Sequence, residues 1–220
     1  MEMLLFSVTG LISLFGGVVI LARSGARYGR TVAIGLLFLS FIEVLYAFFS
    51  LGGNLAFFRA ASFFEASSTA AFLASVTTME KRLAKNKTLI KWEQFLLSIF
   101  CILYGVLILF KPMDTFSWGP DGDIHLGWVA KLQAIFVLIS AVFFMWIMEN
   151  IMLSSTEEQK RILKYPALGI IALGLAFVLM AVRRLSTMLA SQDMFVLYSL
   201  IFLVAIIFII FFSIRFRLFE

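Results

Sequence analysis

The sequence predicts an all-α protein, a polytopic membrane protein folded as a seven-transmembrane-helix bundle. Three observations support this. Hydrophobic residues make up 62% of the chain and charged residues 14%, whereas globular domains carry about 25% charge. The mean hydropathy is +1.04. The apolar residues form seven runs, each about long enough to cross the ~30 Å hydrocarbon layer as a helix. The expected spans, within one domain covering residues 1–220, are 3–22, 31–51, 55–79, 89–110, 127–148, 163–182 and 194–214.

Each of the first three runs has a feature that supports its assignment. No cation precedes the first run, as it would in a signal peptide, so we expect this run to be retained as a span. The second run ends at Gly52-Gly53, which predicts a tight turn into the third. The third run carries small residues that let membrane helices approach closely. These are Ala61, Ser68 and Ala71.

The last four runs continue the pattern. Cys101, the single cysteine, lies inside the fourth run and is expected to be a small apolar filler. Trp128 at the start of the fifth suits an interfacial aromatic belt. The sixth holds Pro166 near its start, where proline is tolerated, and a row of small residues. These are Ala167, Gly169, Ala172, Gly174 and Ala176. The seventh is nearly all Ile, Phe, Leu and Val and contains no lysine, so it offers no anchor for a retinal Schiff base.

The distribution of basic residues predicts the orientation. Thirteen of the eighteen Lys and Arg residues fall in the links 23–30, 80–91 and 149–164 and in the tail after residue 214. Because cytoplasmic loops are enriched in Lys and Arg, these four regions are expected on the cytoplasmic side. The N-terminus is then outside, the C-terminus is cytoplasmic, and the location is the inner (cytoplasmic) membrane. The net charge of +5 requires no nucleic acid, because basic loops meet anionic lipid headgroups.

The outer loop over residues 111–126 is the longest on its side. Asp121-Gly122-Asp123 lacks the further acidic ligands of a calcium loop, so a solvated turn is expected there and no metal site is predicted. His125, the only histidine, is expected at the surface. The chain also has no Walker loop, nucleophile elbow, HExxH or dinucleotide motif. No catalytic residue or cofactor is therefore predicted, and enzymatic activity of this chain has no support.

Ionisable residues inside the predicted spans are the candidate functional groups. Such residues are costly in lipid and usually face the bundle interior. Glu43 in the second span and Glu65 in the third lie at similar depth in the outer half. Neighbouring groups at helical spacing share their faces, and three arginines lie near the outer boundary. The predicted sensing site comprises Glu43, Tyr46, Arg59, Ser62, Glu65, Thr69, Arg183 and Arg184.

These charges allow three interpretations. The two carboxylates could pair with arginines and set the register of the helices, a purely structural role. They could line a polar pocket, open to the outer side, in which arginines hold a small anionic ligand or sense lipid. They could instead form a path for protons or ions.

The link between the fifth and sixth spans resembles a known family. It reads Met148-Glu149-Asn150-Ile151, followed by Ser154 to Gly169 with Arg161 and Lys164. This resembles the membrane sensor region of PrsK-type histidine kinases, which are associated with exopolysaccharide and PEP-CTERM systems. That family has Glu-Asn-Leu at the inner end of a span, a basic residue in the link, and Lys followed by Leu-x-x-Gly. This chain departs from it at Ile162, where tryptophan is common, and at Leu153, where arginine is common.

The resemblance implies a sensor input region followed by a cytoplasmic kinase domain. From the residues themselves, Ser155 to Glu158 has the spacing of a capping box that starts the sixth helix. Glu149, Asn150 and Lys164 are predicted as a signal relay, with Glu149 pairing with a cation such as Lys164. The alternative for these residues is an ordinary helix–link–helix at the membrane face.

We therefore expect a membrane signal-input domain that passes an outer or intramembrane stimulus to a cytoplasmic output such as a histidine kinase. A small-solute transporter using the same charges is the alternative class, and a scaffold that anchors partners is a third. The expected partners are membrane lipid, a small anionic ligand, a cytoplasmic signalling domain and a second copy of the chain.

Overall fold

A helix covers each of the seven predicted runs. The computed structural model describes residues 2–24, 27–84, 90–118, 124–185 and 193–215. Within these ranges the long helices are α1 (Glu2–Arg23), α2 (Arg27–Gly52), α3 (Leu55–Ala84), α4 (Ile90–Phe110), α5 (Trp128–Ser154), α6 (Glu157–Leu185) and α7 (Asp193–Arg215). Between α4 and α5 lie a short 3-10 helix, η1 (Pro112–Asp114), and two strands, β1 (Phe116–Trp118) and β2 (Ile124–Leu126). The all-α class is confirmed, with one small hairpin added.

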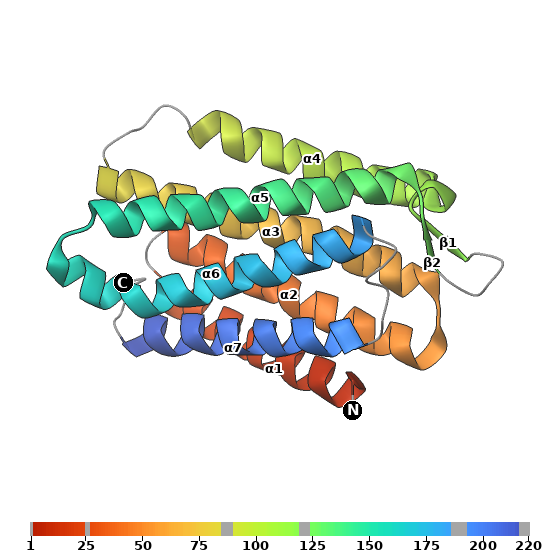
Figure 1. Ribbon diagram of the computed structural model, residues 1–220, viewed down its shortest axis with the longest axis horizontal. Coiled ribbons are helices and arrows are strands. Elements are labelled where there is room, and N and C mark those ends of the chain that lie inside the picture. The colour runs from red at the N-terminus through yellow and green to blue at the C-terminus, as the bar shows by residue number, and fades with distance from the viewer. Residues whose placement is uncertain (1, 25–26, 85–89, 119–123, 186–192, 216–220) are drawn as a thin grey trace.

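Six of the helices form a closed ring. α2 packs between α1 and α3, α5 between α3 and α6, and α7 between α6 and α1. α4 lies outside this ring and packs mainly against α3 (Figure 1). The hairpin and the N-terminus lie at one end of the bundle, whereas the α5–α6 turn and the end of α7 lie at the other (Figure 1). Side chains from all six helices fill the interior of the ring, among them Leu36, Phe72, Phe144, Phe177 and Phe202.

α3 is the central polar helix of the bundle. Between residues 55 and 79 only Ala56 is exposed. Because α2, α4 and α5 pack around it, this part of α3 presents little surface to lipid, and it tolerates Arg59, Glu65 and many hydroxyls. Four other helical segments are long and apolar enough to cross a membrane, which makes this chain a membrane protein. These are Met3–Arg23, Gly29–Gly52, Trp128–Ser154 and Leu163–Val182.

Small and hydroxyl residues bring the helices together. A Cβ added at Gly169 of α6 would lie 3.0 Å from the backbone oxygen of Ala205 in α7, so these two backbones are in close contact. The hydroxyl of Ser13 in α1 donates to the Leu36 carbonyl at 2.8 Å, and that of Ser68 in α3 donates to the Gly35 carbonyl at 3.0 Å. Side-chain hydrogen bonds of this kind join helices in membranes, where no hydrophobic driving force does so. They tie α1 and α3 to two consecutive residues of α2.

The predicted outer loop contains a docked hairpin. β1 and β2 pair antiparallel, with Phe116 opposite Leu126 and Ser117 opposite His125. Phe116 is fully buried and packs edge-on against Phe58 of α3, with ring centroids 4.8 Å apart. Three-residue strands are too short to leave an alternating pattern, so no pattern of residues predicts them. His125 is exposed, as expected, whereas the predicted turn at Asp121 and Asp123 lies outside the described residues.

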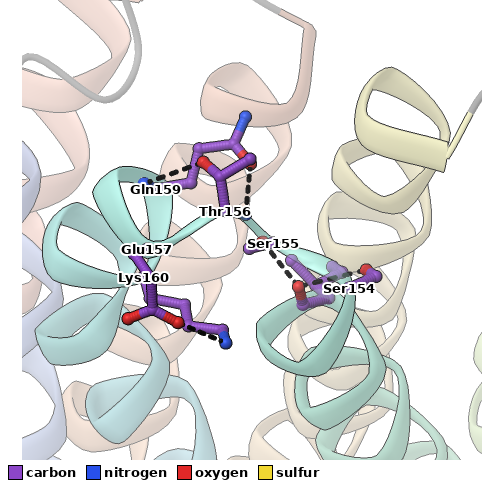
Figure 2. A network of polar contacts seen from close by, with 7 residues as sticks. Ser154, Ser155, Thr156, Glu157, Gln159 and Lys160 are labelled. Carbon is purple, nitrogen blue, oxygen red and sulfur yellow. Dashed lines mark hydrogen bonds and ion pairs between the residues drawn. The ribbon is translucent and has the colours of Figure 1, made fainter.

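The turn from α5 to α6 begins with a capping box, but one residue later than predicted. The backbone N–H of Gln159 donates to Thr156 Oγ1 at 3.4 Å, and the backbone N–H of Thr156 donates to Gln159 Oε1 at 3.1 Å. Figure 2 shows this reciprocal pair. The prediction that Ser155 and Glu158 form it was wrong, because Ser155 instead donates back to the Ile151 carbonyl and closes the end of α5. Such a cap contributes about 1 kcal/mol to the helix it starts.

Candidate functional site

Glu65 of α3 is the centre of a buried polar network. Its carboxyl group is 1% exposed and accepts two hydrogen bonds from neighbouring helices. The Tyr46 hydroxyl of α2 donates to Oε1 at 2.9 Å, and the Gln133 amide of α5 donates to Oε2 at 3.0 Å. The same amide also lies 3.3 Å from the Ser62 carbonyl. One carboxyl group thus joins α2, α3 and α5 within the ring.

The network continues along α3 toward the hairpin. The Ser62 hydroxyl shares a 2.9 Å hydrogen bond with the Tyr104 hydroxyl of α4 and donates to the Arg59 carbonyl at 2.7 Å. Arg59 Nη2 donates to the Phe116 carbonyl of β1 at 2.5 Å. Arg59 Nε is buried and has no partner among the described residues. About two turns of α3, or ~9 Å, separate Arg59 from Glu65. Polar groups therefore run from the hairpin to the middle of the bundle.

Glu43 of α2 lies in a second part of the interior. Its side chain is 1% exposed and is close enough to Glu65 for their charges to interact. The Ser199 hydroxyl of α7 donates to Glu43 Oε2 over a long 3.5 Å. α1 covers this site closely, because a Cβ added at Gly10 would lie 3.3 Å from Glu43 Cβ. Glu43 therefore sits where α1, α2 and α7 meet.

The structure buries five of the predicted site residues in the interior of the bundle. Glu43, Tyr46, Ser62, Glu65 and Thr69 are all buried, and Thr69 donates to the Glu65 carbonyl at 2.8 Å. The predicted pairing of carboxylates with arginines fails for Arg59, which forms no ion pair with a described carboxylate and donates to the hairpin backbone instead. Arg59 lies about two turns of α3 from Glu65, at the end of the helix that contacts the hairpin. The side chains of Arg183 and Arg184 lie outside the described residues, so their predicted role is untested.

The predicted relay residues lie at the opposite end of the bundle. Glu149 and Lys164 are exposed, Asn150 is half-buried, and no ion pair joins Glu149 to Lys164. Among the described residues the one ion pair is Glu157–Lys160, within the first turn of α6, at 2.9 Å (Figure 2). An exposed pair at this spacing contributes little to stability. The relay therefore stays a prediction.

Sequence reasoning missed three members of the polar network: two partners of the carboxyl groups and one partner of Ser62. Gln133 is fully buried and stands out as the one amide inside the apolar run of the fifth span, so its position alone could have marked it. Tyr104 and Ser199 are buried as well. No signal in the sequence distinguished them from other Tyr and Ser residues, since only the packing of α4 and α7 brings them to Ser62 and Glu43.

The groups described at this site offer hydrogen bonds and charge. Among the described residues no group of three or more His, Cys, Asp or Glu side chains could hold a metal ion. The acceptor oxygens are two carboxyl groups, and the groups around them are hydroxyls and one amide. A buried polar network whose members are satisfied rigidifies the packing of the helices that it joins.

The fold and this network define a class: a helical membrane protein with a buried polar core inside a ring of helices. No protein-family description, no curated protein and no solved structure matches the chain.

Proposed function

We propose that the chain crosses the inner membrane seven times, with the N-terminus outside, and serves as the signal-input domain for a cytoplasmic output. The seven-span topology requires that α3, α4 and α7 also cross the membrane, although they are not among the four strongly apolar helices. α3 has 30 residues, about 45 Å of helix, and lies between α2 and α5, which are both apolar enough to span. α4 and α7 contain the apolar segments Leu96–Phe110 and Leu197–Phe211. Because neighbouring helices of the ring pack along their lengths, we expect all of them to lie in the membrane together.

Cysteine labelling tests the seven spans. In a Cys101→Ala background, single cysteines replace Asn54, Lys87, His125 and Thr156, and intact cells are treated with a membrane-impermeant maleimide. We expect labelling at 54 and 125 from outside, and at 87 and 156 only after lysis, because one span separates each successive pair. A permeant maleimide that labels all four positions is the control. External labelling at 87 would show that α3 does not cross, and the seven-span proposal would fail.

One observation carries the signalling proposal: the buried network links the outer hairpin to the interior of the ring. A ligand or lipid that moves the hairpin would displace the Phe116 carbonyl and with it the Arg59 side chain. Arg59 and Glu65 lie on the same helix, α3, so the displacement would reach the hydrogen bonds of Glu65. Glu65 is bonded to α2 and α5, and the interaction between Glu65 and Glu43 extends the network to α7. A stimulus with different affinities for two packings would shift their populations. The resemblance to PrsK-type sensor regions supports a kinase as the output.

A chimera tests this function. The full chain is joined at Glu220 to the cytoplasmic kinase core of a characterised sensor, and basal output is read from its reporter promoter. Glu65→Gln keeps the size of the side chain but changes its charge and hydrogen bonding to Tyr46 and Gln133. We expect the basal output to change by about fivefold or more, since coupling between sites is typically 1–3 kcal/mol.

The matched control is Leu132→Ala, next to Gln133 but exposed on the outer face of α5. We expect no change in output from it. Unchanged output for Glu65→Gln, in a protein that folds and inserts normally, would contradict the signalling role. Loss of uptake of a solute by cells carrying the same variant, with output unchanged, would favour the transporter.

A further inference from the structure

One face of α6 exposes side chains in a definite chemical order. Positions three and four residues apart share a face of a helix. The opposite face of α6 is buried, for example at Leu163, Ala167, Ile170 and Leu173. From the α5–α6 turn toward the middle of the helix, the exposed face carries one acid, then two cations, then three aliphatic side chains. These are Glu158, Arg161, Lys164, Leu168, Ile171 and Leu175, and all six are exposed.

The spacing along the helix axis matches one leaflet of a bilayer. The segment Leu163–Val182 is long and apolar enough to cross a membrane, so Lys164 lies at the edge of the hydrocarbon layer. The helix rises about 16 Å from Lys164 to Leu175, which is about half of the ~30 Å hydrocarbon core. From Glu158 to Lys164 it rises about 9 Å, comparable with a headgroup layer about 5–8 Å thick. The aliphatic side chains therefore lie at the depth of acyl chains, and the three charged ones lie at the depth of headgroups.

The three charged side chains have no ion-pair partner within the part of the chain that the structure describes. The ion pair of this segment, Glu157–Lys160, lies beside this face and uses neither Arg161 nor Lys164. All three charged side chains reach the surroundings of the bundle, because they are exposed. A partner at this face therefore meets two cations next to the apolar surface and an acid one turn further out.

We propose that this face of α6 binds a phospholipid whose headgroup carries a primary amine, as in phosphatidylethanolamine. In such a lipid the ammonium group is outermost, the phosphate follows, and the acyl chains lie below, which is the order of the acid, the cations and the aliphatic side chains of α6. Arg161 and Lys164 donate charge-assisted hydrogen bonds to the phosphate, and Glu158 accepts them from the ammonium group. A choline headgroup has no N–H to donate, and a glycerol headgroup has no positive charge for Glu158. The site requires only that α6 crosses the membrane, so it does not depend on the signal-input role.

Competitive lipid binding to the purified full chain tests the proposal without any output domain. The protein in detergent receives an equimolar mixture of phosphatidylethanolamine, phosphatidylcholine and phosphatidylglycerol with identical acyl chains, and native mass spectrometry measures which lipid stays bound. We expect phosphatidylethanolamine to be retained about tenfold over phosphatidylcholine, equivalent to 1.4 kcal/mol, because only the primary ammonium group donates hydrogen bonds to Glu158. Equal retention of these two lipids would overturn the proposal. Retention of phosphatidylglycerol at or above the level of phosphatidylethanolamine would also overturn it, because any anionic lipid would then suffice.

A change of the acid decides whether the preference belongs to this face. Glu158→Gln should abolish the preference for phosphatidylethanolamine over phosphatidylcholine, because the amide carries no charge to attract the ammonium group. Glu157→Gln is the matched control, an equal change on the same turn whose side chain is 86% exposed and pairs with Lys160, and it should keep the preference. The same preference in Glu158→Gln as in the unchanged protein would place the lipid elsewhere on the surface and contradict the proposal.

A change of the two cations tests the phosphate contact. Arg161→Gln together with Lys164→Gln should lower the retention of phosphatidylethanolamine about tenfold, equivalent to 1.4 kcal/mol. Lys111→Gln together with Lys131→Gln removes the same charge from exposed positions near the hairpin and should not change it. Equal losses in the two double variants would mean that net charge alone attracts the lipid. All four positions are exposed, so these variants are expected to fold, and lipid binding can be measured even if the chimera fails to signal.

Discussion

Replacing Glu65 with alanine is expected to lower the free energy of unfolding by about 3 kcal/mol. The change removes the carboxyl acceptor of the Tyr46 hydroxyl and of the Gln133 amide, and a buried donor that loses its acceptor costs about 1–3 kcal/mol. It also leaves a cavity where the carboxyl group packed. Reversible unfolding in mixed micelles measures the difference. Hydrogen bonds between membrane helices average about 0.6 kcal/mol, so Tyr46→Phe alone should cost much less.

The control for this prediction is Glu158→Ala on the exposed first turn of α6, which should change stability by less than about 0.5 kcal/mol. A double-mutant cycle of Tyr46→Phe with Glu65→Gln then isolates the bond itself. If Glu65→Ala were as mild as Glu158→Ala, the network would not hold the ring together, and Glu65 would have alternative donors.

Gly127→Ala is expected to detach the hairpin from the bundle. A Cβ at Gly127 would collide with the backbone carbonyl of Asp114, and backbone atoms cannot move aside as a flexible side chain can. The Gly127 N–H also donates to the Thr115 carbonyl at 2.8 Å, a bond that any shift of this strand would strain. Overpacking of this kind costs about 3 kcal/mol. Because the strain is local, limited proteolysis at the hairpin should accelerate by about tenfold or more while the helices persist.

Gly52→Ala is the matched control, since a Cβ there has no neighbour within 4 Å. We expect it to leave both unfolding and proteolysis unchanged. Equal proteolysis of the two variants would mean that η1 and β2 are not held together as described. If the hairpin also transmits the stimulus, Gly127→Ala should uncouple the chimera's output from it, because Phe116 would no longer hold Arg59.

Much of the candidate site was predictable, because polar residues inside apolar runs are conspicuous. Glu43 and Glu65 were placed at similar depth from their positions in antiparallel runs, and helical spacing brought Ser62 and Thr69 to the face of Glu65. Their partners were not predictable in the same way. The arginines looked like natural partners by charge, but Arg59 lies about two turns away and reaches the hairpin instead.

The error at the capping box comes from local competition between equivalent groups. Ser155 and Thr156 have equal capping chemistry, and only the geometry at the end of α5 decides that Ser155 closes one helix while Thr156 starts the next (Figure 2). The hairpin was missed because strands of three residues carry too little pattern, and their stability depends on burying Phe116 against Phe58.

The residues alone predict a helical membrane protein and the positions of its helices, because the length of an apolar run and the need to satisfy backbone hydrogen bonds in lipid act locally along the chain. Tertiary packing alone selects which helices are neighbours, places α3 in a six-helix ring with α4 packed on its outer side, and brings the two buried acids to hydroxyls and an amide. These depend on contacts between residues far apart in the chain, where several partners of equal chemistry compete and packing alone selects among them.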